Sequence, residues 1–168
     1  MTSASKAKGN SFERRVADFL TNLYGEKFIR APGSGAYVGG KNTVRKQFLH
    51  EGQIRNFKGD IVPGQSFPKF NAECKSYKDF AFHQLFGENR VLEAWLDQLM
   101  DVSDPGDFNI LMMKFNRKGE YVVTQKSAIA DPAGNHALYQ SPKHGTWIVQ
   151  DFDQFWKNHS QQVRDLSA

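Results

Sequence analysis

Two short acidic motifs contain the residue types needed for cation-dependent phosphodiester hydrolysis. Gly59-Asp60-Ile61 supplies one carboxylate, and Glu73-Cys74-Lys75 supplies a second carboxylate and an amine. Two carboxylates held close together repel each other, so their joint ionisation favours a bound cation. Mg²⁺ fits this need because it prefers oxygen ligands and is usually held by one or two carboxylates and substrate phosphates. The pattern therefore indicates water attack on phosphate beside Mg²⁺, with Lys75 stabilising the developing charge.

An extended second motif would place its carboxylate and its amine on one face of a strand. Side chains at i and i+2 point the same way, so Glu73 and Lys75 project together while Cys74 faces the core. The turn-rich stretch 63–68 predicts a chain reversal and therefore a hairpin that brings Asp60 alongside. On its own, this loose pattern favours a solvated strand face with an ordinary ion pair. The rest of the chain has to decide between the two interpretations.

A helix is predicted near the N-terminus, with Asn10 or Ser11 as N-cap and Gly25 as its stop. Its apolar stripe consists of Phe12, Val16, Phe19, Leu20 and Leu23. Glu13 lies at the border of this stripe, so it can face a site, although the helix dipole alone also favours an early glutamate. The first nine residues and the last several are expected to be loosely held.

The segment after this helix predicts a short strand over 26–30, followed by a loop over 31–36 that Pro and Gly keep irregular. Small residues in such a loop let a phosphate backbone approach closely. Arg30 and Ser34 could then contact phosphate oxygens. An ordinary surface turn would have the same composition, and both interpretations stay open.

Four motifs follow one another in the first half of the chain: Lys8-Gly9 to Glu13-Arg14, Arg30 to Ser34-Gly35, Gly59-Asp60-Ile61 and Glu73-Cys74-Lys75. Their order resembles the archaeal-type Holliday-junction resolvases of the PD-(D/E)XK nuclease superfamily. The resemblance implies a homodimeric, Mg²⁺-dependent endonuclease that cuts paired strands of four-way DNA junctions, with Mn²⁺ expected to substitute. Two departures are visible: Gly59 stands where the superfamily usually has proline, and the span from Gly35 to Asp60 is longer.

The resemblance also implies roles for individual residues. The catalytic set would be Glu13, Asp60, Glu73, Lys75 and Ser34. Its three carboxylates would organise metal and water, and Ser34 would belong to a mobile loop near the cleaved strand. Phosphate contacts are expected from Lys8, Arg14, Arg30, Lys41, Arg45 and Lys46.

Residues 36–58 are predicted to form a DNA-contacting extension, because basic residues alternate there with aromatic ones. A solvated hairpin would have a similar composition. Residues 1–58 contain 11 Lys and Arg against 4 Asp and Glu, whereas the rest contains 11 against 14. This basic half is where the expected phosphate contacts lie, so it favours sequence-independent attraction to DNA.

The remaining elements predict an α/β fold, restriction-endonuclease-like, with a mixed central sheet flanked by helices. A helix is expected over 80–100; Gln84 or Gln98 on it could reach the site, although exposure to solvent is favoured for either. Strands are expected over 109–115, 120–124 and 147–149, and a closing helix begins near Phe152. The 168 residues suit a single nuclease domain over 1–168.

One cysteine and no apolar run long enough to span a membrane lead us to expect an intracellular, cytoplasmic protein, nucleoid-associated if prokaryotic or viral. Three functions remain open. The preferred one is a junction-resolving endonuclease. The second is another endonuclease of the superfamily, acting on duplexes, flaps or single strands, since fold does not fix substrate. The third is a nonenzymatic junction-binding protein with structural acidic residues.

Overall fold

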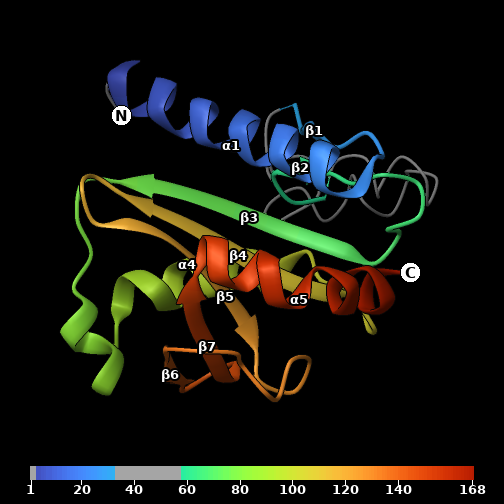
Figure 1. The fold of residues 1–168 in the computed structure, drawn as a ribbon. Coiled ribbons are helices and arrows are strands. Elements are labelled where there is room, and N and C mark those ends of the chain that lie inside the picture. Colours follow the sequence, from blue (N-terminus) through green and yellow to red (C-terminus); the bar gives the residue numbers. More distant parts are fainter. Residues whose placement is uncertain (1–2, 33–57) are drawn as a thin grey trace.

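A mixed five-stranded sheet forms the centre of the molecule, which the computed structural model describes over residues 3–32 and 58–168 (Figure 1). The spatial order is β3-β4-β5-β7-β6, and only β3 and β4 are parallel. The bounds are β3 (Phe70–Tyr77), β4 (Phe108–Phe115), β5 (Gly119–Gln125), β6 (His136–Ser141) and β7 (Gly145–Asp151). The mixed α/β fold and three predicted strands, here β4, β5 and β7, are confirmed. β6 was not predicted, because its apolar residues Ala137, Leu138 and Tyr139 are consecutive and do not alternate with polar ones.

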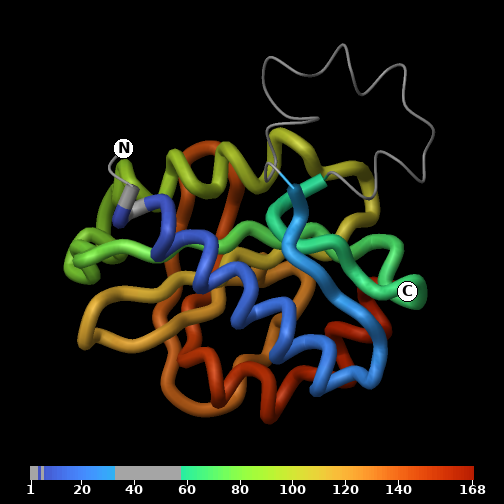
Figure 2. The backbone as a smooth tube through the Cα atoms, turned by 90° about the horizontal axis from the view of Figure 1, so that it is seen from above, coloured from blue at the N-terminus to red at the C-terminus, as the bar shows by residue number. Residues whose placement is uncertain are grey.

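Helices cover both faces of this sheet. The helices α1 (Ser3–Tyr24) and α5 (Phe152–Ser167) pack on one face, where Ala72 and Cys74 of β3 join their core. The opposite face carries α4 (Arg90–Asp101) and the short 3₁₀ helix η3 (Phe82–Phe86). Figure 2 shows α1 crossing the sheet beside β3. In the described ranges, no helix has the length and apolar character needed to cross a membrane.

Two predictions about helix ends were wrong. The helix α1 begins at Ser3, and Asn10 does not cap it but accepts a hydrogen bond from Arg30 Nη2 at 2.6 Å. The segment before Asn10 carries good helix formers, which extend the helix despite Gly9. The C-terminus is also ordered, because α5 runs to Ser167, whose carbonyl accepts from Lys69 N. The stop at Gly25 is confirmed, with a φ of 66°.

The predicted helix over 80–100 is interrupted. The first part is η3, and α4 begins only after Asn89, whose side chain accepts from Leu92 N at 2.9 Å and thereby caps the helix. The predicted apolar stripe on α4 is confirmed, since all four of its members are buried: Leu92, Trp95, Leu96 and Leu99.

The strands β1 (Ile29–Arg30) and β2 (Ile61–Val62) form a separate antiparallel pair. The predicted hairpin was therefore wrong, because β2 pairs with β1 rather than with β3. One backbone hydrogen bond still joins this segment to the main sheet, from Asp60 N to Ala72 O at 2.8 Å. Asp60 therefore lies beside β3 as expected, but through this hydrogen bond and not through a hairpin.

A buried polar cluster connects α4 to β6. Glu93 accepts hydrogen bonds from Tyr139 Oη and Ser141 Oγ, each at 2.7 Å. Burial, followed by the bond to Glu93, raises the pKa of Tyr139 to about 12, so the hydroxyl stays a donor.

The Tyr139→Phe variant should lower stability by about 1–3 kcal/mol, because it leaves the buried Glu93 carboxylate without one donor. Thermal unfolding should show a drop of roughly 2–4 °C for each kcal/mol. Tyr121→Phe is the control, since the hydrogen bond that its hydroxyl makes in the described part of the chain goes to the Lys118 carbonyl at an exposed position. An unchanged Tm for Tyr139→Phe would contradict the role given to this cluster.

Candidate active site

Asp60 is fixed against the free edge of β3, which is the outermost strand of the sheet. Its backbone N donates to Ala72 O at 2.8 Å, and its Oδ2 accepts from Cys74 N at 2.8 Å. Ala31 N in turn donates to Asp60 O at 2.8 Å. Asp60 thus contacts the edge much as a partner strand would. These bonds use only the Oδ2 atom of its carboxylate, and the side chain also interacts with Glu73.

Glu73 lies in the middle of β3, on the face covered by α4, and is fully buried. In the described part of the chain, neither of its carboxylate oxygens accepts a hydrogen bond from a neutral or cationic donor. Burial, and then the charge of Asp60, raise the pKa of Glu73 well above its usual range. In register beside it on β4 is apolar Leu111, which cannot compensate its charge.

Lys75 shares the face of Glu73, as strand alternation predicted. Its Nζ lies 4.0 Å from Glu73 Oε2 and donates to Gln98 Oε1 of α4 at 2.5 Å. Cys74 faces the other side and is buried in the core, which confirms that it is a core thiol. Burial, and then the charge of Asp60, raise the pKa of the Cys74 thiol well above its usual range.

Glu13 approaches the same edge from α1 and is nearly buried, so its predicted inward orientation is confirmed. Its charge contributes to the raised pKa of Glu73. Arg30 Nε donates to Glu13 Oε2 at 2.5 Å, while the guanidinium also contacts Asn10. Arg30 therefore holds Glu13 in place, and its contact with phosphate remains a prediction.

Gln98 was expected to face solvent rather than to reach the site. It is exposed, but its amide oxygen also contacts Lys75, so it orients the one amine of the site. The partner of Gln98 could not be predicted from the sequence, because this contact depends on how α4 crosses β3. Only the position of Gln98 beside the apolar Leu99 and Leu96 of α4 placed it near the sheet.

For the DNA cleavage expected from the sequence, Gln98→Ala should lower the rate about 10-fold, as is usual when a residue that orients a reacting group is lost. The ammonium of Lys75 would keep its charge but lose its fixed position. Single-turnover cleavage at saturating Mg²⁺ measures the effect, with Gln84→Ala on η3 as the control. Equal rates for the two variants would show that the contact is incidental.

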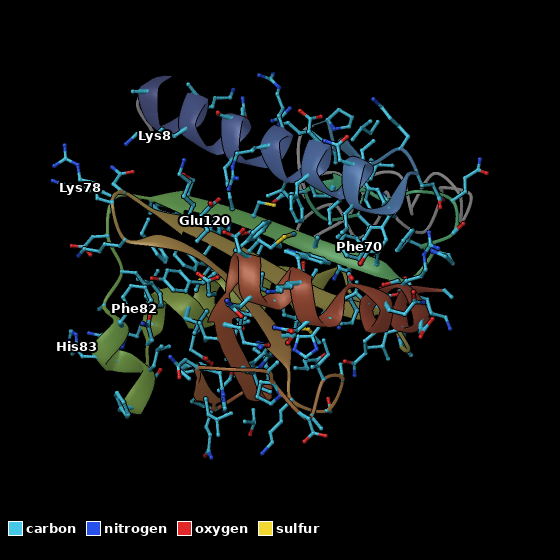
Figure 3. All side chains as sticks on the ribbon, in the orientation of Figure 1. Lys8, Phe70, Lys78, Phe82, His83 and Glu120 are labelled. Atoms are coloured by element: carbon cyan, nitrogen blue, oxygen red, sulfur yellow. The ribbon has the colours of Figure 1, made fainter. Side chains whose placement is uncertain are left out.

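The other predicted contacts fall into two groups. Lys8 and Arg14 are exposed on α1. Figure 3 shows Lys8 near the N-terminal end of α1, on the side of the molecule where β3 ends and Lys78 follows it. Outside the described residues lie Ser34, Lys41, Arg45, Lys46 and all but the last residue of the 36–58 extension. That last residue, Lys58, is buried and paired within the chain.

The carboxylates at the β3 edge fit a hard divalent cation. Among the described residues, no donor reaches the two buried oxygens of Glu73, and the Asp60 carboxylate interacts with the Glu73 side chain. Carboxylate oxygens are the ligands that Mg²⁺ prefers, with water and substrate oxygens completing its shell. Within residues 3–32 and 58–168, no three acidic, His or Cys side chains form a preassembled cluster. The fit therefore rests on Asp60 and Glu73, and ligation by Glu13 remains a prediction.

Comparison with known proteins adds independent information. A family model described as "Phage putative PDDEXK endonuclease" matches residues 4–164. Protein D14 of Escherichia phage T5 is 28% identical over 172 residues, covering 96% of each chain. No solved structure matches this chain. The family match spans both acidic motifs and the helix that carries Glu13.

Proposed function

The chain belongs to the phage PDDEXK endonuclease family, and from this premise we propose that it is a divalent-cation-dependent endonuclease that resolves four-way DNA junctions. The observation that carries the catalytic part is the meeting of Asp60, Glu73 and Lys75 at one edge of β3. Two buried carboxylates beside one amine are costly to keep without a charged partner. Their retention is understandable if a cation and a phosphate occupy this edge during the reaction.

Each residue has a separate task in this proposal. Asp60 and Glu73 would hold Mg²⁺, which when bound supplies a Lewis acid for the phosphate and lowers the pKa of water. Lys75 would donate hydrogen bonds to a non-bridging phosphate oxygen, where negative charge accumulates. Water would lose a proton to solvent as its oxygen bonds to phosphorus, the bond to the leaving sugar oxygen would break, and that oxygen would take up a proton from solvent. Glu13, held by Arg30, would keep the edge acidic and help to orient water.

The junction substrate rests on the motif order in the sequence. A homodimer would present two sites to opposed strands of one junction, which makes two-fold symmetry useful for paired cuts. Exposed Lys8 and Arg14 are available to contact phosphates on the same side as α1. A purely DNA-binding protein would gain nothing from acidic groups turned toward phosphate, which disfavours the nonenzymatic alternative.

The test is cleavage of a labelled four-way junction and of a linear duplex with the same sequence, each with Mg²⁺, Mn²⁺ or EDTA. We expect symmetric cuts in the junction with either cation and none with EDTA. Cutting of the duplex alone would move the protein to the second class of endonuclease. Tight binding without cutting under every condition would overturn the enzymatic proposal.

A further inference from the structure

Gly59 has a backbone conformation that almost only glycine adopts. Its φ is 72°, in the left-handed region, whereas proline is restricted to about −65°. A Cβ built on Gly59 would lie 2.6 Å from Ala72 O and 3.1 Å from Asn71 Oδ1. Glycine is therefore required at position 59, where the superfamily usually has proline, because the backbone has a positive φ and β3 leaves no room for a side chain.

The atoms that crowd Gly59 cannot easily move away. Ala72 O belongs to the backbone of β3 and accepts the hydrogen bond from Asp60 N. Asn71 is fully buried, and its Nδ2 donates to Leu99 O at 3.0 Å and to Asn109 Oδ1 at 2.8 Å. A side chain at position 59 would therefore push its own backbone, and Asp60 with it, away from β3.

Lys58 anchors the same segment from the other side. It is buried, and its Nζ lies 2.9 Å from Asp104 Oδ2 and pairs with Asp107 as well. Both aspartates lie between α4 and β4. Lys58, two residues before Asp60, is thus attached to the connection between α4 and β4, at the end of the sheet where β3 and β4 begin.

We propose that Lys58 and Gly59 are positioning residues that hold the Asp60 carboxylate at the β3 edge: Lys58 fixes the approach of the chain, and Gly59 permits the close contact. The link to catalysis rests on the proposed function, because it assumes that Asp60 binds the cation. The link to geometry does not, because the hydrogen bond between Cys74 N and Asp60 Oδ2 reports the position of Asp60 directly.

The decisive variant is Gly59→Ala, compared with Gly134→Ala. Gly134 also has a positive φ, 74°, but a Cβ there would meet nothing within 4 Å. The first readout is the Cys74 amide resonance in ¹⁵N NMR spectra of protein in EDTA, with Asp60→Ala as reference. We expect Gly59→Ala to shift this resonance toward its position in Asp60→Ala, while Gly134→Ala leaves it in place.

The second readout is Mn²⁺ binding by calorimetry, together with the Mg²⁺ dependence of cleavage. Gly59→Ala should weaken Mn²⁺ binding about 10-fold or more and lower the maximal cleavage rate about 100-fold. Gly134→Ala should lose only stability, with cation binding and cleavage unchanged. A folded Gly59→Ala protein with native Cys74 amide and native cation affinity would overturn the proposal.

Lys58 gives a second, independent test if Gly59→Ala fails to fold. Lys58→Met should weaken Mn²⁺ binding several-fold, Lys58→Arg should restore most of it, and Lys118→Met, which breaks an exposed ion pair with Asp79, should change nothing. Equal cation binding by wild type, Lys58→Met and Lys58→Arg would contradict the anchoring role. If wild type cleaves no DNA, the proposed function fails, and the Cys74 amide still decides whether Asp60 is positioned as inferred.

Discussion

Asp60→Asn is expected to abolish DNA cleavage while leaving the protein folded. Asparagine keeps an oxygen that can accept the hydrogen bond from Cys74 N, so the local structure should survive. It removes the negative charge that would hold the cation. Loss of several kcal/mol of cation-dependent stabilisation corresponds to a rate decrease of about 10³-fold or more. Cleavage of a labelled four-way junction at saturating Mg²⁺ measures this decrease.

A second consequence separates catalysis from binding. In EDTA, Asp60→Asn should bind DNA at least as tightly as wild type, because one negative charge facing the phosphates has been removed. Asp165→Asn removes the same charge from an exposed position on α5 and should keep full activity. Cleavage by Asp60→Asn within about threefold of wild type would show that this carboxylate is not required, whatever its position at the β3 edge.

Local periodicity was enough to predict part of this site. Alternation along one strand correctly placed Glu73 and Lys75 on one face and Cys74 in the core. Helical spacing correctly turned Glu13 inward. These predictions succeeded because each depends on a single element whose period is two or 3.6 residues.

The contacts between different elements could not be predicted from the sequence. Asp60 was expected on a strand paired with β3, yet β2 pairs with β1, and Asp60 reaches the β3 edge through its own hydrogen bonds to Ala72 and Cys74. The contact of Lys75 with Gln98 depends on the path of α4 across the sheet. The burial of Lys58 depends on a connection almost fifty residues further along the chain. No local pattern encodes such contacts.

Glu73→Gln should have opposite effects on activity and on stability. Cleavage should fall by about 10³-fold or more, because a neutral amide is a poor ligand for Mg²⁺ and binds no charge. In EDTA, however, the variant should be more stable than wild type. Glu73 is fully buried, its oxygens lack donors in the described part of the chain, and Asp60 lies beside it. Glutamine keeps the shape, removes the charge and can donate to Asp60.

The stability gain should depend on pH in a defined direction. In the folded, cation-free protein the pKa of Glu73 is raised well above the value of 4.5 for an unperturbed glutamate. Its protonated form therefore stabilises the fold fully below about pH 4.5, and this contribution is lost as pH rises toward and through the raised pKa. The Tm of Glu73→Gln in EDTA should match wild type in acid and exceed it increasingly toward neutral pH.

Added Mg²⁺ should reverse this difference. Under the proposed function the cation binds only the folded state of wild type, so the wild-type Tm should rise with Mg²⁺ concentration. Glu73→Gln should respond weakly, since half of its cation-binding pair is gone. Thermal unfolding from about pH 4.5 to 8, with EDTA and with Mg²⁺, measures both trends. A Glu73→Gln variant less stable than wild type at neutral pH in EDTA would contradict this prediction. The buried carboxylate would then stabilise the fold, instead of lowering its stability in return for cation binding.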